Sequence, residues 1–119
     1  MSLELDLALK LVKEAEGFEP HEYRCTAKKL TQGYGRNLEV HPLSYEEKAE
    51  LNEDGSVSEE VAERWAIKEL YECEEKLNSN IIYQKQSDVR KAVLLDMCFN
   101  IGYTGLTKFK KMWYVCSKC

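Results

Sequence analysis

The stretch EGFEPHEYRCTAKKLTQGYG, residues 16–35, decides the fold of this 119-residue chain. Apolar side chains precede it at spacings that place them on one face of a helix over residues 4–16; these are Leu5, Leu9, Val12 and Ala15. Gly17 is a natural stop, because glycine readily adopts the left-handed conformation that ends many helices. The pattern therefore places Glu16 at the end of a helix.

Residues 22–36 are predicted to form short strands joined by turns. Aromatic and β-branched side chains recur in this segment, and Gly33 and Gly35 suit tight backbone turns. We expect the small sheet region to cover about residues 20–45.

The remaining segments are predicted to be helical. Ser44 begins a capping-box pattern for a short helix over 45–51, and a long helix is expected over about 57–77. Ser87 is expected to cap a buried helix over 88–100 that is apolar nearly all round. We expect Gly102 and Gly105 to break that helix, and a final helical piece to start near Leu106.

A helix, a small sheet and then helices predict an α+β fold, with the sheet near the N-terminus. The length predicts one domain, residues 1–119, with a helical lobe over about 57–115. With 44% hydrophobic residues, such a chain can bury a core without disulfide bonds.

Composition and charge also disfavour several classes of protein. No run approaches the roughly 20 apolar residues of a membrane span, so we expect no stable membrane insertion. The N-terminus does not have the pattern of a signal peptide. No broad basic surface is indicated, so nucleic acid is not an expected partner. Acidic residues predominate over 39–75, which is typical of a solvated helix face.

The cysteines do not have the pattern of a disulfide framework. Their number is odd and their spacing irregular; they are Cys25, Cys73, Cys98, Cys116 and Cys119. Reduced thiols are therefore expected. A single CxxC at the C-terminus, without a second pair, is a weak metal signal, so we expect no metal and no cofactor.

Glu16 is the strongest candidate for chemistry. The dipole at a helix C-terminus disfavours a charged carboxylate, and partial burial would raise its pKa further, as a general acid requires. The ordinary alternatives are a solvent-exposed glutamate, a small core residue at Cys25 and a strand-forming residue at Thr31. A Cys–His protease site with His21 or His41 is a further alternative, but the usual cysteine-protease context is missing.

The register of Glu16, Cys25 and Thr31, followed by Gly-Tyr-Gly-Arg-Asn-Leu, resembles the phage-type lysozymes (endolysins, muramidases). The segment LDMCFNIG over 95–102, followed by GLTKF over 105–109, is similar to that family's central helix and the loop after it. The resemblance covers roughly residues 5–112 and implies a lysozyme-like fold.

This resemblance implies a glycoside hydrolase that cleaves the β-1,4 bond between N-acetylmuramic acid and N-acetylglucosamine. Glu16 would protonate the glycosidic oxygen, while Cys25 and Thr31 would position water on the opposite face of the sugar. That arrangement implies inversion at the anomeric carbon. The implied partner is a peptidoglycan glycan strand, the protein is expected to be a monomer, and its implied role is host cell lysis. It would stay in the cytoplasm of the bacterial host until release to the wall.

At the position of Cys25 the family usually has Asp, although some members are similar to this chain in having Cys. Three departures from the family's pattern set the alternatives. The family usually has glycine in the hairpin where residues 26–29 read TAKK, and an apolar residue in place of Gln32. Its members also continue with further helices beyond the region of residues 109–113. We therefore expect a truncated form whose exposed apolar surface favours self-association. The alternative functions are a non-catalytic remnant and a peptidoglycan-binding protein. A helical regulatory domain is a third alternative, in which the two motifs would match the family by coincidence.

Overall fold

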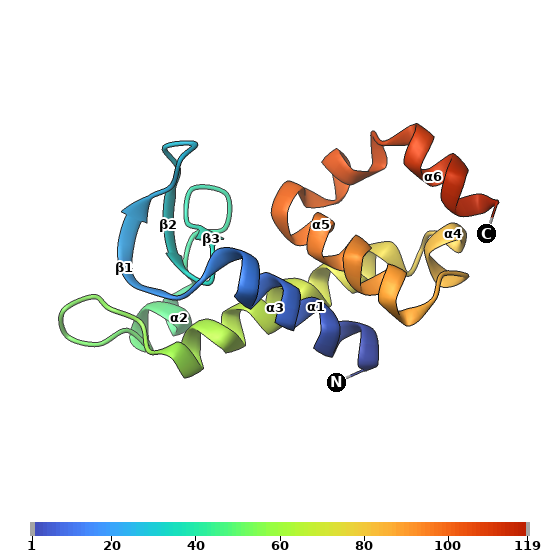
Figure 1. The fold of residues 1–119 in the computed structure, drawn as a ribbon. Coiled ribbons are helices and arrows are strands. Elements are labelled where there is room, and N and C mark those ends of the chain that lie inside the picture. The colour runs from blue at the N-terminus through green and yellow to red at the C-terminus, as the bar shows by residue number, and fades with distance from the viewer. Residues whose placement is uncertain (1, 119) are drawn as a thin grey trace. The chain divides into compact units, whose positions relative to one another are not determined.

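The computed structural model describes residues 2–118 (Figure 1). Its elements are, in order, α1 (Leu3–Glu16), β1 (Glu19–Arg24), β2 (Leu30–Gly33), β3 (Arg36–Asn37), α2 (Tyr45–Ala49), α3 (Glu59–Leu77), α4 (Ile81–Gln84), α5 (Asp88–Thr107) and α6 (Lys110–Ser117). The three strands form one antiparallel sheet in the order β1-β2-β3. This arrangement confirms the predicted α+β class, with the sheet near the N-terminus and a mainly helical remainder.

The described residues form two compact units, 13–66 and 2–12 with 67–118. The first unit holds the sheet and α2, the second holds α4, α5 and α6, and α1 and α3 contribute residues to both. The single domain expected from the length stays a prediction. The residues singled out for chemistry, Glu16, Cys25 and Thr31, all belong to the unit 13–66.

The sheet of the unit 13–66 is held against the beginning of α3. Tyr23 pairs with Thr31, and Thr31 pairs with Asn37, so β2 is the central strand. At the end of β2, a Cβ on Gly33 would lie 3.2 Å from the Cβ of Ala62. The strand backbone therefore approaches α3 too closely for a larger residue to fit without adjustment.

A buried ion pair joins β3 to α2. The Nη1 and Nη2 atoms of Arg36 donate to the carboxylate of Glu47, and the Arg36 carbon Cζ lies 5.2 Å from the ring centre of Trp65. The predicted capping box is confirmed, because Ser44 Oγ accepts from the Glu47 amide at 3.2 Å and Glu47 Oε1 accepts from the Ser44 amide at 2.9 Å. Glu47 therefore both caps α2 and neutralises Arg36.

Gln32, which replaces an apolar residue of the family pattern, is completely buried. Its amide nitrogen donates to the carbonyls of Pro20 at 2.9 Å and Gly55 at 3.0 Å. The amide nitrogen therefore joins β1 to the loop before α3, while the side-chain oxygen Oε1 is buried without a hydrogen-bond partner within residues 2–118.

The other unit is built around apolar side chains of its helices; the buried ones from residue 67 on are Leu70, Leu77, Tyr83, Ala92, Leu94, Leu95, Cys98, Leu106 and Trp113. Trp113 of α6 donates its indole N–H to the carbonyl of Leu106 in α5 at 3.1 Å. Gln86 donates to the carbonyls of Ile82 at 3.0 Å and Cys116 at 3.2 Å. These bonds connect α6 to the elements that precede it.

Several helix boundaries differ from the expectation. Gly102 is non-helical, at φ +81° and ψ +158°, so α5 consists of two helical segments joined by a kink at the residue where a break was expected. Gly105 does not break the helix, because the second segment continues through it to Thr107. Leu106 therefore belongs to α5, and the last helix begins at Lys110. The short helix α4 was not expected; its first turn is capped by the side chain of Asn80. The non-helical backbone of Gly102 interrupts the helix, and a second helical segment follows it.

The burial of two helices was also predicted wrongly in part. On α5, Val89 is 64% exposed and Val93 is 45% exposed, so the helix is not buried all round. Their spacing of four residues places them on one face. On α1, Ala8 is buried and Ala15 is exposed, because Ala15 lies in the last turn at the edge of the apolar stripe. None of the helices over residues 2–118 is long and apolar enough to cross a membrane.

Candidate active site

Glu16 is the last residue of α1, as predicted. The Gly17 amide donates to the carbonyl of Lys13 at 3.1 Å, and Gly17 then turns the chain out of the helix at φ +68°. The Glu16 side chain is half-buried. The end of α1 therefore places the Glu16 carboxyl group close to the start of β1.

The Gly33-Tyr34-Gly35 turn meets this carboxyl group directly. Gly35 has φ +72°, and a Cβ added to it would lie 2.6 Å from both Cδ and Oε2 of Glu16. Ordinary van der Waals contact begins near 3.4 Å, so only a residue without a side chain leaves the carboxyl group in this place. The glycine noted for turn formation thus also makes room for Glu16.

Tyr34 holds that turn in position. Its hydroxyl donates to Oε1 of Glu59 at 2.7 Å, and its ring centre lies 5.6 Å from that of Phe18. Burial, followed by the hydrogen bond to Glu59, raises the pKa of Tyr34 to about 12. The phenol therefore stays protonated and keeps donating at neutral pH.

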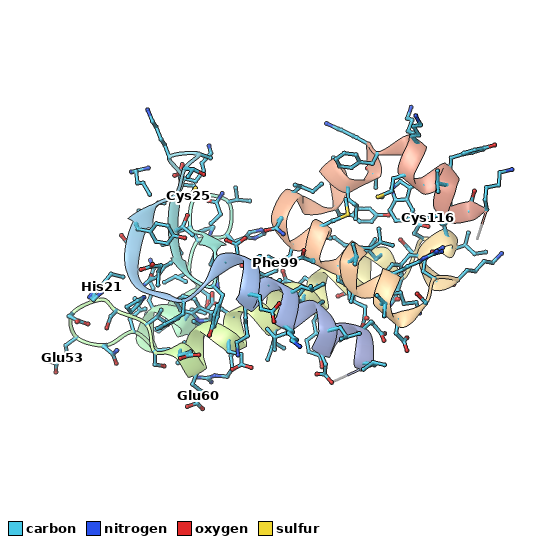
Figure 2. The ribbon with its side chains drawn as sticks, viewed as in Figure 1. His21, Cys25, Glu53, Glu60, Phe99 and Cys116 are labelled. Atoms are coloured by element: carbon cyan, nitrogen blue, oxygen red, sulfur yellow. The ribbon has the colours of Figure 1, made fainter. Side chains whose placement is uncertain are left out.

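Cys25 follows β1 at the start of the hairpin turn, where Figure 2 labels it. Its amide donates to the carbonyl of Lys29 at 3.0 Å, and its carbonyl accepts from the amide of Lys28 at 2.7 Å. Lys28 has φ +61°, a left-handed conformation that costs an L-residue roughly 1–2 kcal/mol. The hairpin therefore turns through a left-handed residue although it lacks the glycine of the family pattern.

The surroundings of Cys25 lower the pKa of its thiol. The hydrogen bond from the Lys29 amide is the largest cause that lowers the pKa of Cys25, and further bonds from Ala27 and Thr31 outweigh partial desolvation. Thr31 is buried, and its hydroxyl also donates to the Lys29 carbonyl at 2.9 Å. Because a hydroxyl carries one hydrogen, Thr31 donates either to this carbonyl or to the Cys25 thiolate at any moment.

Tyr23 belongs beside these residues and was not singled out from the sequence. Burial raises its pKa, and the charges of Glu16 and Cys25 raise it further. The Tyr23 phenol is therefore near enough to Glu16 and Cys25 for their charges to affect its pKa. The sequence showed only that Tyr23 lies two residues before Cys25; its position opposite Thr31 depends on the pairing of β1 with β2.

The alternative of a Cys–His protease pair receives no support at His21. The His21 imidazole lies 3.5 Å from Oδ2 of Asp54, and Figure 2 shows His21 near the loop that carries Glu53, away from the hairpin turn with Cys25. Within residues 2–118, no group of three or more His, Cys, Asp and Glu side chains has the arrangement of a metal site. Cys119 of the terminal CxxC lies outside the described residues.

The comparison with protein families agrees with this arrangement. The family model described as Phage lysozyme matches residues 13–115 of the 119-residue chain. The chain therefore belongs to the phage lysozyme family, which indicates a lysozyme type of activity on peptidoglycan. No curated protein matches the chain.

Proposed function

We propose that this protein hydrolyses the β-1,4 bond between N-acetylmuramic acid and N-acetylglucosamine with inversion, using Glu16, Cys25 and Thr31. The observation that carries the proposal is the convergence of the carboxyl group of Glu16 with the Gly33-Tyr34-Gly35 turn, in the same unit as the contact between Cys25 and Thr31. A general acid and a water-positioning pair are the two components that an inverting glycosidase requires.

Glu16 is assigned as the general acid. It lies at a helix C-terminus, where the dipole disfavours the carboxylate, and it is half-buried against the backbone of Gly35. Both conditions favour the protonated carboxyl group. Proton transfer to the glycosidic oxygen then assists departure of the leaving sugar.

Cys25 and Thr31 are assigned to the attacking water. A neutral thiol is a poor base, but the hydrogen bonds to the Cys25 sulfur increase the fraction of thiolate at a given pH. The thiolate would accept a proton from water, and the Thr31 hydroxyl would orient the same molecule. Tyr23, next to Glu16 and Cys25, is a positioning residue in this scheme.

The test is release of reducing sugar ends from purified peptidoglycan, together with clearing of permeabilised bacteria. The unmodified protein is expected to be active, and Glu16→Gln is expected to abolish both signals while leaving the circular dichroism spectrum unchanged. Gln retains the shape of the side chain but cannot supply the proton. Equal rates for the two proteins would refute the assignment of Glu16.

A non-catalytic peptidoglycan-binding protein is the second candidate, and the thiol at Cys25, in place of the usual carboxylate, is the observation that favours it. It predicts co-sedimentation with peptidoglycan without release of reducing ends. In either case the proposed setting is phage-induced lysis, in which the protein reaches the wall after synthesis in the bacterial cytoplasm.

A further inference from the structure

The C-terminal segment concentrates positive charge in an otherwise acidic chain. Residues 97–119 contain four lysines and no acidic residue; the lysines are Lys108, Lys110, Lys111 and Lys118. The whole chain has a net charge of −4, so residues 1–96 carry −4 − 4 = −8. All four lysine side chains are exposed. The proposed hydrolysis uses none of them.

The last helix, α6, is attached to its own unit through one face. Trp113 is buried, and its indole N–H donates to the carbonyl of Leu106 at 3.1 Å. With about 3.6 residues per turn, Met112 and Cys116 share this face with Trp113, and both are partly buried. The opposite face of α6 is therefore the one that solvent reaches.

This opposite face, here called the outer face of α6, mixes lysines with large apolar side chains. Tyr114 is 63% exposed, and Lys118 Nζ lies 5.0 Å from the centre of its ring. Phe109, directly before the helix, is 48% exposed. The exposed residues that define the outer face are Lys110, Lys111, Tyr114, Val115 and Lys118. Such a combination is typical of a helix that binds a membrane surface.

We propose that the outer face of α6, together with Lys108 and Phe109, docks on a bilayer surface rich in anionic phospholipid. The lysine ammonium groups would pair with the headgroup phosphates, and the aromatic rings would enter the interface. The helix would lie in the plane of the surface, because its 8 residues are too few to span a bilayer. The negative charge of residues 1–96 would be repelled, so the protein approaches with this end.

Charge and composition favour lipid over other occupants of this face. A second copy of the chain would bring the same lysines together, which opposes a symmetric dimer through the outer face. A soluble polyanion would pair with the lysines but would leave Tyr114 and Phe109 in water. A bilayer interface accommodates both the charged and the apolar side chains.

The experiment mixes the full chain with vesicles of equal parts phosphatidylglycerol and phosphatidylcholine and measures the sedimented fraction against protein without vesicles. Binding is expected to these vesicles and not to vesicles of phosphatidylcholine alone. Raising the salt from about 0.1 M to about 1 M shortens the Debye length from about 10 Å to about 3 Å and is expected to release the protein.

A pair of double variants tests whether the outer face carries the binding. Each lysine near an anionic surface strengthens binding about 5-fold, so Lys110→Gln with Lys111→Gln is expected to weaken it about 5 × 5 = 25-fold. The matched control, Lys10→Gln with Lys68→Gln, removes the same charge from exposed positions of α1 and α3 in the same unit. It is expected to bind almost as the unmodified chain does.

Tyr114→Ala tests the apolar part of the proposal. If about half of the apolar surface of Tyr114 enters the interface, the variant is expected to bind vesicles about 5-fold more weakly, with unchanged binding to polyphosphate. Circular dichroism checks that each variant is folded.

Three results would overturn the proposal: no binding to anionic vesicles, equal binding to both kinds of vesicle, or equal losses in the two double variants. Polyphosphate binding together with an unchanged vesicle affinity of Tyr114→Ala would also overturn it and would identify the outer face as a site for polyanions. Because the assay contains no peptidoglycan, its result is independent of the proposed hydrolysis.

Discussion

Gly35→Ala tests whether the Gly33-Tyr34-Gly35 turn positions the carboxyl group of Glu16, the proposed general acid. The new Cβ would lie 2.6 Å from Glu16 Cδ, whereas ordinary contact begins at 3.4 Å, so the carboxyl group must move by 3.4 − 2.6 = 0.8 Å. The end of a flexible side chain moves at little cost in stability. A displacement of about 1 Å in a reacting group, however, lowers turnover by about 100-fold, or roughly 2.7 kcal/mol of activation free energy.

Gly55→Ala is the matched control. Gly55 belongs to the same unit and has φ +83°, similar to the +72° of Gly35, but nothing lies within 4 Å of a Cβ added there. Both variants are expected to lose roughly 1–2 kcal/mol of unfolding free energy, because each places an L-residue in the left-handed region. Only Gly35→Ala is expected to lose activity.

The assay is reducing-sugar release at saturating peptidoglycan, measured well below the melting temperature of both variants and corrected for the folded fraction from circular dichroism. A Gly35→Ala rate within a few-fold of the Gly55→Ala rate would refute the reasoning that Gly35 makes room for Glu16. A much larger loss of stability in Gly35→Ala would show that the methyl group displaces backbone rather than the carboxyl group.

Three further predictions follow from single contacts. Lys28→Gly is expected to raise the unfolding free energy by about 1 kcal/mol in urea denaturation, since it removes the left-handed strain at φ +61°; a lower midpoint would contradict this. Glu47→Gln should lower the unfolding free energy by about 3 kcal/mol in the same assay, because it leaves the buried Arg36 without its counter-charge. A loss below about 1 kcal/mol would show that solvent screens the charge interaction between Arg36 and Glu47. In a pH–rate profile, the activity of the native protein should fall as the pH drops through the lowered pKa of Cys25, because protonation removes the thiolate. Cys25→Asp should extend activity to more acidic pH, since a carboxylate with a pKa near 3.9 stays ionised there, and an unchanged acidic limb would exclude Cys25 as the base.

Local features of the fold were predictable because neighbouring residues determine them. Gly17 ends α1 directly after Glu16, and Ser44 and Glu47 form their capping box, since each feature depends on residues within one helical turn. Boundaries after Gly102 were predicted less well. A glycine permits a non-helical residue, as at Gly102, but the surrounding packing decides whether one is adopted, and Gly105 stays helical.

The candidate site was also only partly predictable from the sequence. The spacing of Glu16, Cys25 and Thr31 was visible in the sequence, and their catalytic roles stay predictions. The neighbourhood of Tyr23 was not visible, because it depends on the pairing of β1 with β2 and on where the end of α1 lies.

The sequence by itself determined the class of fold, the helix end that carries Glu16 and the register that resembles the phage lysozymes. Only the tertiary structure decided that Gly35 lies against the Glu16 carboxyl group and that Val93 stays exposed. Periodicity and turn chemistry act over a few residues, whereas the contact of Glu16 with Gly35 joins residues 35 − 16 = 19 positions apart. Such contacts arise from packing of whole elements, which no local pattern specifies.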